Sequence, residues 1–347
     1  MTDRAGGPHS PDGGPSPAAA RGTRGIATRG VAWVRDTVSD VGPGLFMILS
    51  VEILVFWRTA HPHFLTQSNF IEIGKRMTII GIAAVGETIV IIAGGFDLSV
   101  GSVAAMASVG SAWVVDNGGP LVVGVLAALA IGALIGVVNG AITGYGRINP
   151  LITTLGTLAV VRGLAYVLTD NKQITVNHEG FQNLGKHSAA GLPYIVWILL
   201  GTFVVFGLII PRYRFGRYMY AIGSNERAAA LAGVRVNRWK LVFYGVSGML
   251  AGLAGLVNAT RLGTGIPSSS IGLELQTITA VILGGTYLLG GRGRLLGTFL
   301  GVLFLSCLLT GLIQSGAEPE YQRVAQGSAL LLAVLYDERR RGRLARG

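Results

Sequence analysis

The stretch IIAGGFDLSVGSVAAM, residues Ile91–Met106, places a carboxylate in an almost wholly apolar part of the chain. Apolar residues run into the glycine pair Gly94–Gly95, Asp97 follows after one residue, and small and apolar residues then resume. A glycine pair interrupts a helix and frees backbone N–H groups, which then need new partners. We expect the helix to restart directly after this break, with Asp97 as an N-cap that accepts from the amides of Ser99 and Val100.

The chain as a whole is too apolar for a soluble protein of its length. It has 347 residues, of which 50% are hydrophobic and 13% are charged, and its mean hydropathy is +0.56. Soluble domains carry about 25% charged residues. The apolar blocks approach the length of about 20 residues that crosses a hydrocarbon layer. The sequence therefore predicts an all-α membrane protein, a polytopic helical bundle of about ten spans with discontinuous helices.

Length and hydropathy locate these spans and the connections between them. The candidate spans lie near residues 44–60, 77–93, 98–115, 120–143, 150–169, 193–211, 239–260, 274–290, 295–314 and 322–337. Two linkers, GGFDL and GGRGR, are short enough to be breaks inside discontinuous helices. The long connection from Asp170 to Pro193 is polar and reads as mobile, whereas the one from Pro211 to Lys240 is basic and contains a short helical pattern.

The formal charge of +11 is read as a topology signal, because the basic residues flank apolar spans and do not line a soluble face with aromatics. Nucleic-acid binding is therefore not expected. An even number of spans puts both ends on one side, and the segments on that side hold most of the Lys and Arg. The opposite segments hold only Lys75, Arg76, Lys172, Lys186 and Arg261. This predicts a multi-pass membrane protein, surrounded by lipid, with both termini cytoplasmic.

Composition divides the chain into three parts. Residues 1–42 are rich in Gly, Pro, Ala, Ser and Arg and are expected to form a disordered, basic cytoplasmic tail. Residues 43–338 form the transmembrane domain, and residues 339–347 form a basic cytoplasmic C-terminal tail. The first apolar run begins only at Gly44, which favours a retained span over a signal peptide.

Glycines at four-residue spacing predict flat helix faces. They occur in the three sets Gly132, Gly136 and Gly140; Gly248 and Gly252; and Gly293, Gly297 and Gly301. In lipid such faces let backbones approach closely, and van der Waals contact then supplies the attraction. A second apolar run into two glycines, VILGGTYLLGG from Val281, aligns Gly284–Gly285 with Gly94–Gly95 and is a weak sign of an internal repeat.

No residue set is suited to covalent chemistry or to a bound cofactor. The segment GIAAVGET has the spacing of a phosphate-binding loop, but Glu87 stands where lysine is needed. The lone cysteine, Cys307, excludes a disulfide framework and a cysteine metal site. The histidines form no metal-ligand pattern and are His9, His61, His63, His178 and His187. We expect neither a catalytic site nor a metal site.

Ionisable residues within the spans are the first candidates for a polar path. An aspartate at bilayer depth is unfavourable by about 2.5–3.5 kcal/mol, so Asp97 should face protein, water or backbone donors. It either lines a path or only caps a helix at the membrane edge. Glu52, Glu87 and Glu274 also lie within or beside spans, and the sequence leaves open whether each is an interior partner or faces a cavity.

A second group of candidates follows from a helix start. Asn149 precedes Pro150 as a cap, and Thr153, Thr154 and Thr157 then share one face. Their hydroxyls can contact a solute, or they can bond to the preceding turn of the helix or to a neighbouring helix. The candidate path residues are Asp97, Ser99, Asn149, Thr153, Thr154, Glu274 and Thr277.

The connection between Pro211 and Lys240 contains GSNERAAALAGV, residues 223–234. Ser224 or Asn225 can cap a helix of two turns, and Gly233 can end it. A short capped helix with a small apolar face can dock into a groove of a partner protein. The alternative, a helix that lies on lipid, needs a larger apolar face than this one offers.

Four stretches resemble one family, the permease subunits of bacterial ABC sugar importers of the ribose, xylose, arabinose and galactose type. They are IIAGGFDLSVGS, LITTLGTLAVVRGLAYVLTD, RFGRYMYAIGSNERAAALAGV and ITAVILGGTYLLGGRGRLLGT, and the resemblance runs from about Phe64 to Val334. It implies a fold like that of type II ABC importers and a location in the bacterial inner membrane. The implied partners are a second copy of the chain, cytoplasmic ATPase subunits that carry ATP and Mg, and an extracytoplasmic solute-binding protein. No cofactor is expected on this chain.

The resemblance also implies roles for two segments. The segment 94–101 would be the family's signature element near the translocation path. The segment 224–233 would be the coupling helix that enters the ATPase, with the residues Ser224, Asn225, Glu226, Arg227, Ala229, Leu231, Ala232 and Gly233. Glu87 departs from the family pattern, where methionine is more usual, and the long tail is not part of the family core.

The expected function is that of the permease subunit of an ATP-driven importer for a sugar, most simply a monosaccharide. A related permease for branched-chain amino acids or nucleosides is an alternative within the same class. An alternative of another class is a secondary transporter or channel, in which carboxylates such as Glu87 and Glu274 bind the coupling ion.

Overall fold

The computed structural model describes residues 43–60 and 64–344, and its regular structure is almost entirely helical. The predicted tail 1–42 and the histidines His61 and His63 lie outside the described residues. The chain divides into the units Met1–Pro43 and Gly44–Gly347, and all of the elements described below belong to the second apart from the first residue of its first helix. The helical prediction is confirmed.

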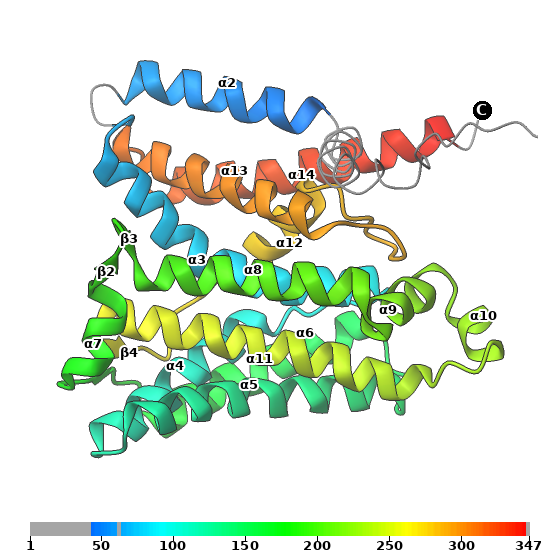
Figure 1. The fold of residues 1–347 in the computed structure, drawn as a ribbon, viewed down its shortest axis with the longest axis horizontal. Coiled ribbons are helices and arrows are strands. Elements are labelled where there is room, and N and C mark those ends of the chain that lie inside the picture. Colours follow the sequence, from blue (N-terminus) through cyan, green and yellow to red (C-terminus); the bar gives the residue numbers. More distant parts are fainter. Residues whose placement is uncertain (1–42, 61–63, 345–347) are drawn as a thin grey trace, which may run out of the picture. The chain divides into compact units, whose positions relative to one another are not determined.

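The elements follow one another along the chain as Figure 1 labels them. The helices are α2 (Pro43–Thr59), α3 (Gln67–Ile92), α4 (Val100–Asp116), α5 (Leu121–Gly144), α6 (Pro150–Leu168), α7 (Glu179–Lys186), α8 (Tyr194–Arg212), α9 (Arg214–Ser224), α10 (Glu226–Leu231), α11 (Val236–Leu262), α12 (Leu273–Leu283), α13 (Leu295–Gln314) and α14 (Pro319–Leu344). The strands are β1 (Ile174–Thr175), β2 (Ser188–Ala189), β3 (Leu192–Pro193) and β4 (Thr264–Gly265), paired antiparallel as β1–β4 and β2–β3.

Each predicted span overlaps one helix, although the span predicted near residues 274–290 extends past the end of its helix, α12, at Leu283. Five of the described helices are long and apolar enough to cross a membrane, namely α5, α6, α8, α11 and α13. By contrast, α12 has only 11 residues and rises about 16 Å, roughly half of a hydrocarbon layer. Helix α4, with 17 residues, is also short. Both short helices adjoin a glycine pair, as expected for discontinuous elements.

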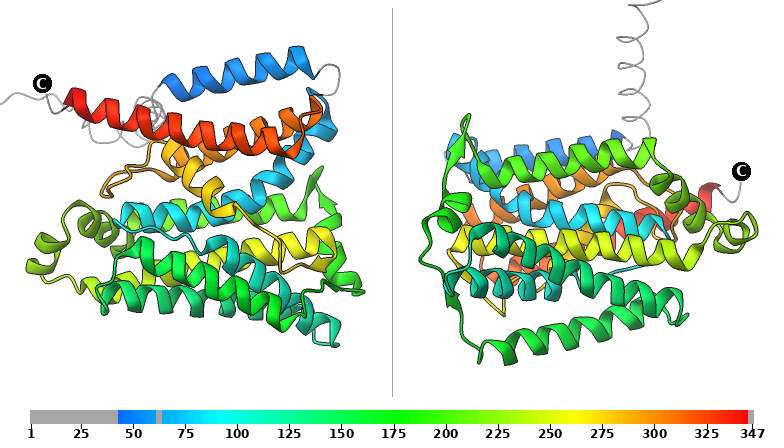
Figure 2. Two further views of the ribbon diagram at one scale, coloured as in Figure 1. Left: turned by 180° about the vertical axis from the view of Figure 1, so that it is seen from behind. Right: turned by 60° about the horizontal axis from the view of Figure 1, so that its bottom comes forward.

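The two ends of the bundle differ in charge and in structure. The start of α2, the helices α9 and α10 and the end of α14 lie at one end, and α7 with the β2–β3 hairpin lies at the other (Figures 1 and 2). We call the end that carries α9 and α10 the basic end, because Arg214, Arg217 and Arg227 belong to these two helices. At the opposite end, Lys75 and Arg261 both pair with Glu72.

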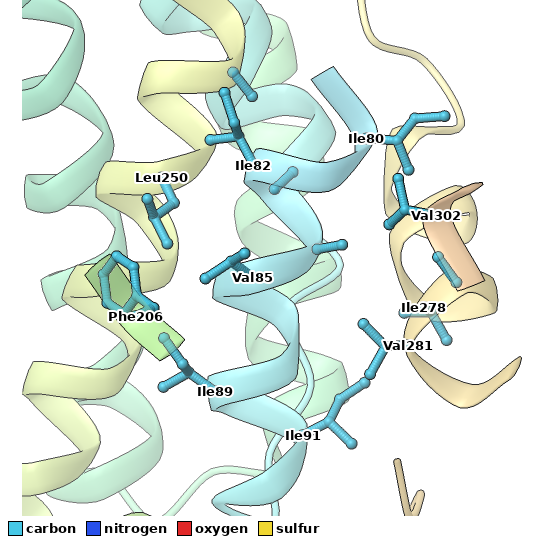
Figure 3. Close-up of a cluster of buried hydrophobic side chains, with 14 of the residues drawn as sticks. Ile80, Ile82, Val85, Ile89, Ile91, Phe206, Leu250, Ile278, Val281 and Val302 are labelled. Carbon is cyan, nitrogen blue, oxygen red and sulfur yellow. The ribbon is translucent and has the colours of Figure 1, made fainter. Parts of the chain in front are cut away.

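The apolar core is built around α3, which contacts α8, α11, α12 and α13. Figure 3 shows side chains that leave α3 in two directions, toward α8 and α11 on one side and toward α12 and α13 on the other. The labelled residues are Ile80, Ile82, Val85, Ile89 and Ile91 of α3, with Phe206, Leu250, Ile278, Val281 and Val302 around them. A helix that is apolar on all sides is one that other helices surround.

The predicted glycine faces are helix contacts. A Cβ at Gly132 would meet the Gly248 carbonyl oxygen, and a Cβ at Gly248 would meet that of Gly132, so α5 and α11 touch through their backbones. In the same way Gly297 of α13 adjoins Gly284, and Gly301 adjoins Ala280. Gly293 differs, because it precedes α13 and faces the side chain of Thr286.

The connection between Asp170 and Pro193 is not the mobile segment that its polarity indicated. Its strand β1 pairs with β4, and α7 packs against α11. Phe181 is completely buried, and together with Val176 it joins an apolar cluster with Leu256. The prediction was wrong because two apolar side chains suffice to fix this polar segment to the bundle.

The last helix continues past the predicted domain boundary. Helix α14 runs to Leu344, whereas the sequence places the start of the C-terminal tail at residue 339. The three-part division of the chain therefore remains a prediction.

We predict that Gly248→Ala lowers the free energy of unfolding by about 1–3 kcal/mol, because the added methyl group forces α5 and α11 apart. Gly207→Ala in α8 is the matched control, since nothing lies within 4 Å of its Cβ position. Thermal unfolding of both variants in detergent measures the difference. Equal stability of the two variants would contradict a close α5–α11 contact.

Candidate functional site

The opening stretch forms a break between α3 and α4 whose backbone is capped. Helix α3 ends at Ile92, and Gly94 takes the left-handed conformation with φ +83°. The Gly94 N–H donates to the Ile91 carbonyl, and the Gly95 N–H donates to the Val90 carbonyl, both at 2.9 Å. This pair of hydrogen bonds is the Schellman motif, which satisfies the last carbonyls of a helix.

Helix α12 ends in the same motif, but the motif is shifted by one residue from the match of Gly284–Gly285 with Gly94–Gly95 that the sequence indicated. Gly285 has φ +83°, its N–H donates to the Ile282 carbonyl, and the Thr286 N–H donates to the Val281 carbonyl. Gly285 therefore corresponds to Gly94, and not to the residue after it. The two breaks share their local geometry, and an internal repeat remains a prediction.

Asp97 is completely buried and accepts hydrogen bonds on both carboxylate oxygens. Oδ1 accepts from the amide (3.0 Å) and the hydroxyl of Ser99, and Oδ2 accepts from the Ser247 hydroxyl at 3.2 Å. The Asp97 N–H in turn donates to Glu87 Oε1 at 3.3 Å. The carboxylate of Asp97 thus ties the segment between α3 and α4 to α11, and its backbone N–H ties the same segment to α3.

The predicted capping role of Asp97 is only partly correct. Ser99, with φ −83° and ψ −9°, is the N-cap residue of α4 and has helical backbone angles. Asp97 accepts from the Ser99 amide, two residues ahead, as in an Asx-turn. Among the described residues no hydrogen bond joins Asp97 to the Val100 amide, because the helical turn already begins at Ser99.

Further polar side chains extend this cluster across the bundle. Asn139 of α5 donates to the Ser99 hydroxyl at 2.9 Å and accepts from Thr157 of α6 at 2.6 Å. Tyr244 of α11 donates to the Phe96 carbonyl at 3.1 Å. We call the whole set the Asp97 network, and its members are Glu87, Asp97, Ser99, Asn139, Thr157, Tyr244 and Ser247.

The Asp97 network is enclosed in this conformation. All of its members except Thr157 are buried. Neither of its carboxylates forms an ion pair with a described residue. Buried side chains whose polar groups are paired, as those of Asp97, Ser99 and Asn139 are here, fix one arrangement of the helices that they join. Asp97 and Ser99 therefore hold α4 in place here, and contact with a solute requires a different conformation.

A second polar cluster lies where α4 and α12 begin. Glu274 Oε1 accepts from the Gly272 amide at 3.2 Å, and its Oε2 is buried without a partner among the described residues. A Cβ at Gly101 of α4 would meet this carboxylate. The hydroxyl of Thr277 donates to the Glu274 carbonyl at 2.9 Å.

Arg162, within α6, belongs to this region and was missed by the sequence analysis. Its Nη1 donates to the carbonyls of Pro267 (2.8 Å) and Ser269 (2.7 Å), in the segment that leads into α12. The sequence did contain a signal for this residue, namely an arginine within a predicted span. Charged side chains are rare at bilayer depth, and those that occur are bonded to specific partners.

The remaining path candidates, Asn149, Thr153 and Thr154, make no hydrogen bond to the Asp97 network or to Glu274 among the described residues, and their place on a path remains a prediction. Asn149 is exposed and caps α6 by accepting from the Leu151 amide at 2.9 Å. Thr154 donates to the Pro150 carbonyl at 2.9 Å, as a residue bonded to its own helix does. Thr153 is buried, and its hydroxyl has no partner among the described residues.

The short helix predicted in the basic connection is present as α10. The Asn225 side chain caps it by accepting from the Ala228 amide at 3.0 Å, and Gly233, with φ +84°, follows its end. Glu226 pairs with Lys240 at 2.8 Å, so α10 is also tied to α11. The capped helix is confirmed, and the sequence left open only whether Ser224 or Asn225 was the cap.

The side chains of α10 and its end divide into a buried and an exposed set. Ala229 is buried, whereas Leu231 is 90% exposed. Arg227 and Ala232 are also exposed. An apolar side chain so fully exposed on a short rigid helix is suited to a partner surface.

Helix α9 joins α10 to both glycine breaks. A Cβ at Gly223 would meet the Ile92 carbonyl, which also accepts from the Gly291 amide at 2.8 Å. A Cβ at Gly290 would meet Gly94. These backbone contacts leave little freedom for α9 to move independently of the two breaks.

Side chains of α9 reinforce this connection. The Tyr220 hydroxyl donates to the Gly293 carbonyl at 2.8 Å, and burial raises the pKa of Tyr220, so the hydroxyl keeps its proton. Phe215 and Tyr218 pack edge-on against Trp239 of α11. Helix α9 is thus fixed to the start of α11 as well.

The described residues contain no group of three or more His, Cys, Asp or Glu side chains that could hold a metal ion. Cys307 is buried. His178 caps α7 by accepting from the Phe181 amide at 3.3 Å.

Comparisons with known proteins identify the family. A family model described as "Branched-chain amino acid transport system / permease component" matches residues 69–335. The chain is 38% identical to the ribose import permease protein RbsC of Escherichia coli over 313 residues, which cover 89% of this chain and 95% of that protein. No solved structure matches.

Two further relatives agree with this result. Identity to the ribose import permease protein RbsC of Bacillus subtilis is 38% over 307 residues, 87% of this chain and 94% of the relative. Identity to the L-arabinose transport system permease protein AraH of Escherichia coli is 38% over 293 residues, 84% and 88% of the two chains. The chain belongs to this permease family. It is a multi-pass membrane protein and not itself an enzyme.

We predict that Asp97→Ala lowers the free energy of unfolding by about 2 kcal/mol or more, because the donors of Ser99 and Ser247 lose their acceptor in a dry interior. Asp116→Ala is the matched control, since Asp116 is the last residue of α4, the helix that follows Asp97, and is exposed. Thermal unfolding in detergent provides the comparison. The structural role of the network would be refuted by an Asp97→Ala protein as stable as the control.

Proposed function

We propose that the chain is the transmembrane permease subunit of an ATP-driven importer that carries a sugar, most simply a monosaccharide, across the membrane. The relatives support the solute class, because RbsC and AraH are named as ribose and L-arabinose permeases and match at least 84% of this chain. An extracytoplasmic binding protein delivers the solute, and a second permease copy completes the path. Separate ATPase subunits carry ATP and Mg.

The coupling step of this proposal rests on one observation, which is that α10 is a short capped helix with an exposed apolar side chain. Caps at both ends keep it rigid, Leu231 is 90% exposed, and α9 connects it to the glycine breaks. In the proposed mechanism the ATPase subunits receive the segment 224–233, and their closure on ATP displaces α10. The exposed side chains that meet the ATPase are Leu231 and Ala232.

The orientation follows from charge. Cytoplasmic segments of membrane proteins are enriched in Lys and Arg. Arginines gather on α9, on α10 and at the start of α11, so the basic end faces the cytoplasm in our proposal. The start of α2 and the end of α14 lie at the same end (Figure 1), which supports a cytoplasmic position for both ends of the described chain in this proposal.

Movement of α10 reaches the membrane interior through α9. Gly223 lies against the carbonyl end of α3, and Gly290 lies against Gly94, so displacement of α9 shifts both breaks together. Helices α4 and α12 adjoin each other at Gly101 and Glu274. The unpartnered Oε2 of Glu274 is our preferred acceptor for a sugar hydroxyl on the path.

Two alternatives have specific support. The description of the matching family names branched-chain amino acids, which keeps an amino-acid solute open. A secondary transporter would use a buried carboxylate for its coupling ion, and Glu87 Oε2 is buried without a partner among the described residues.

Reconstituted transport separates these functions. We expect ATP-dependent uptake of a pentose in liposomes that contain the chain, its ATPase and its binding protein, and no uptake by the chain alone. Ribose, L-arabinose and leucine serve as test solutes. Uptake by the chain alone would favour a secondary transporter, and uptake of leucine in place of the sugars would favour the amino-acid class.

We further predict that Leu231→Asp reduces solute-stimulated ATP hydrolysis about tenfold or more, because a charge replaces an apolar contact at the centre of a docking surface. Leu262→Asp, at the end of α11 opposite the basic end, is the control and is also largely exposed. Hydrolysis is measured in the reconstituted complex. Normal stimulation with Leu231→Asp would remove the coupling role from α10.

A further inference from the structure

Beside α10, the basic end contains a groove of about 880 Å³. The turn between α5 and α6 forms one wall, α10 forms another, and the start of α11 forms a third. The basic side chains that line it are Arg147, Arg227, Arg235, Arg238 and Lys240. Glu226 is the one acidic residue in the lining, and it pairs with Lys240 at 2.8 Å.

The charges of the groove are not balanced within the protein. Five basic residues and one acidic residue leave an excess of four positive charges, 5 − 1 = 4. None of the four arginines forms an ion pair with a described residue. Basic residues that only set the orientation of the chain need to lie on one side of the membrane and need not lie close together. Here three separate segments bring them into one groove. Such a concentration of unpaired cations is suited to an anion.

The depth of the groove indicates what kind of anion reaches it. Its lining includes the last residues of α5, Thr143 and Gly144, and the first residues of α6 and α11, Pro150 and Val236. Since helices that cross a bilayer leave the hydrocarbon at their ends, the groove opens at the level of the headgroups.

Apolar side chains continue from the groove along the lipid-facing side. Tyr145 and Ile148 line the groove and are 56% and 47% exposed. Leu151 and Ile152 follow on α6 and are 44% and 68% exposed. Cations at headgroup level with exposed apolar side chains directly below match a phosphate that is attached to acyl chains.

We propose that this groove binds the phosphate headgroup of an anionic phospholipid. Excess positive charge favours an anionic headgroup over a zwitterionic one, because a zwitterion brings its own cation into the groove. Arg227 lies on α10 and Arg238 on α11, so one bound phosphate contacts both helices and steadies α10. The assignment to the cytoplasmic leaflet rests on the proposed orientation of the chain, whereas the binding itself does not.

The test measures lipid binding to the purified full chain in neutral detergent micelles, with no ATPase present. The probe is fluorescent phosphatidylglycerol, and fluorescent phosphatidylcholine is the zwitterionic reference. We expect the double variant Arg147→Ala with Arg238→Ala to bind phosphatidylglycerol about 30-fold more weakly, from about 1 kcal/mol for each arginine removed.

Two controls separate a built site from general charge attraction. Arg214→Ala with Arg217→Ala removes the same charge from exposed positions of α9 outside the groove, and we expect its affinity to stay within about twofold. Arg147→Lys with Arg238→Lys keeps the charge, and we expect it to retain most of the binding. Equal losses in both alanine pairs, or no loss in either, would overturn the proposal.

Two further outcomes assign the groove to other ligands. If inorganic phosphate competes with phosphatidylglycerol at equal concentration, the groove binds free phosphate and the lipid proposal is wrong. If the Arg147→Ala, Arg238→Ala chain keeps its lipid but no longer associates with the ATPase, the groove is a protein contact. Neither outcome depends on sugar uptake, so failure here is distinguishable from failure of the proposed function.

Discussion

A helix that breaks inside a membrane must satisfy its freed backbone groups from within the protein, because lipid tails offer no hydrogen bonds. This constraint governs the two glycine breaks of the chain. Each break begins with the same pair of backbone bonds, at Gly94 and at Gly285. The segment after the first break is then held by Asp97, whose oxygens accept from Ser99 and Ser247. The short helices α4 and α12 exist because such internal partners replace water.

The same contacts that satisfy the breaks connect them to the surface. The Ile92 carbonyl, at the end of α3, accepts from Gly291 and lies against Gly223 of α9. No side chain intervenes at these glycines, so movement of α9 is transmitted by backbone contact. A permease without ATPase activity needs such a mechanical connection, and the proposed lipid site would steady its exposed end.

Sequence reasoning located the elements that local rules determine. The positions of the apolar helices, the glycine faces and the capped helix α10 follow from hydropathy, four-residue spacing and the pattern from Asn225 to Gly233, and all three are present. The sequence predicts the local hydrogen bond from the Ser99 amide to Asp97, but not the distant partners of this network. Ser247 is 150 residues away in sequence, and Asn139 is 40 residues from Ser99, so only the packing of α4, α5 and α11 brings them together. The sequence also did not predict the one-residue shift between the two breaks. The first glycine of one pair, Gly94, takes the left-handed conformation, whereas in the other pair it is the second glycine, Gly285.

The proposed mechanism requires α10 to lie on the cytoplasmic side, exposed when no ATPase is bound. Labelling of Leu231→Cys with a membrane-impermeant maleimide tests this most directly, since the chain's one native cysteine, Cys307, is buried. In cells that produce the chain without its ATPase, we predict no labelling in intact cells and full labelling in inside-out vesicles. Labelling from outside intact cells would contradict the orientation, the coupling role of α10 and the ATP-driven mechanism together.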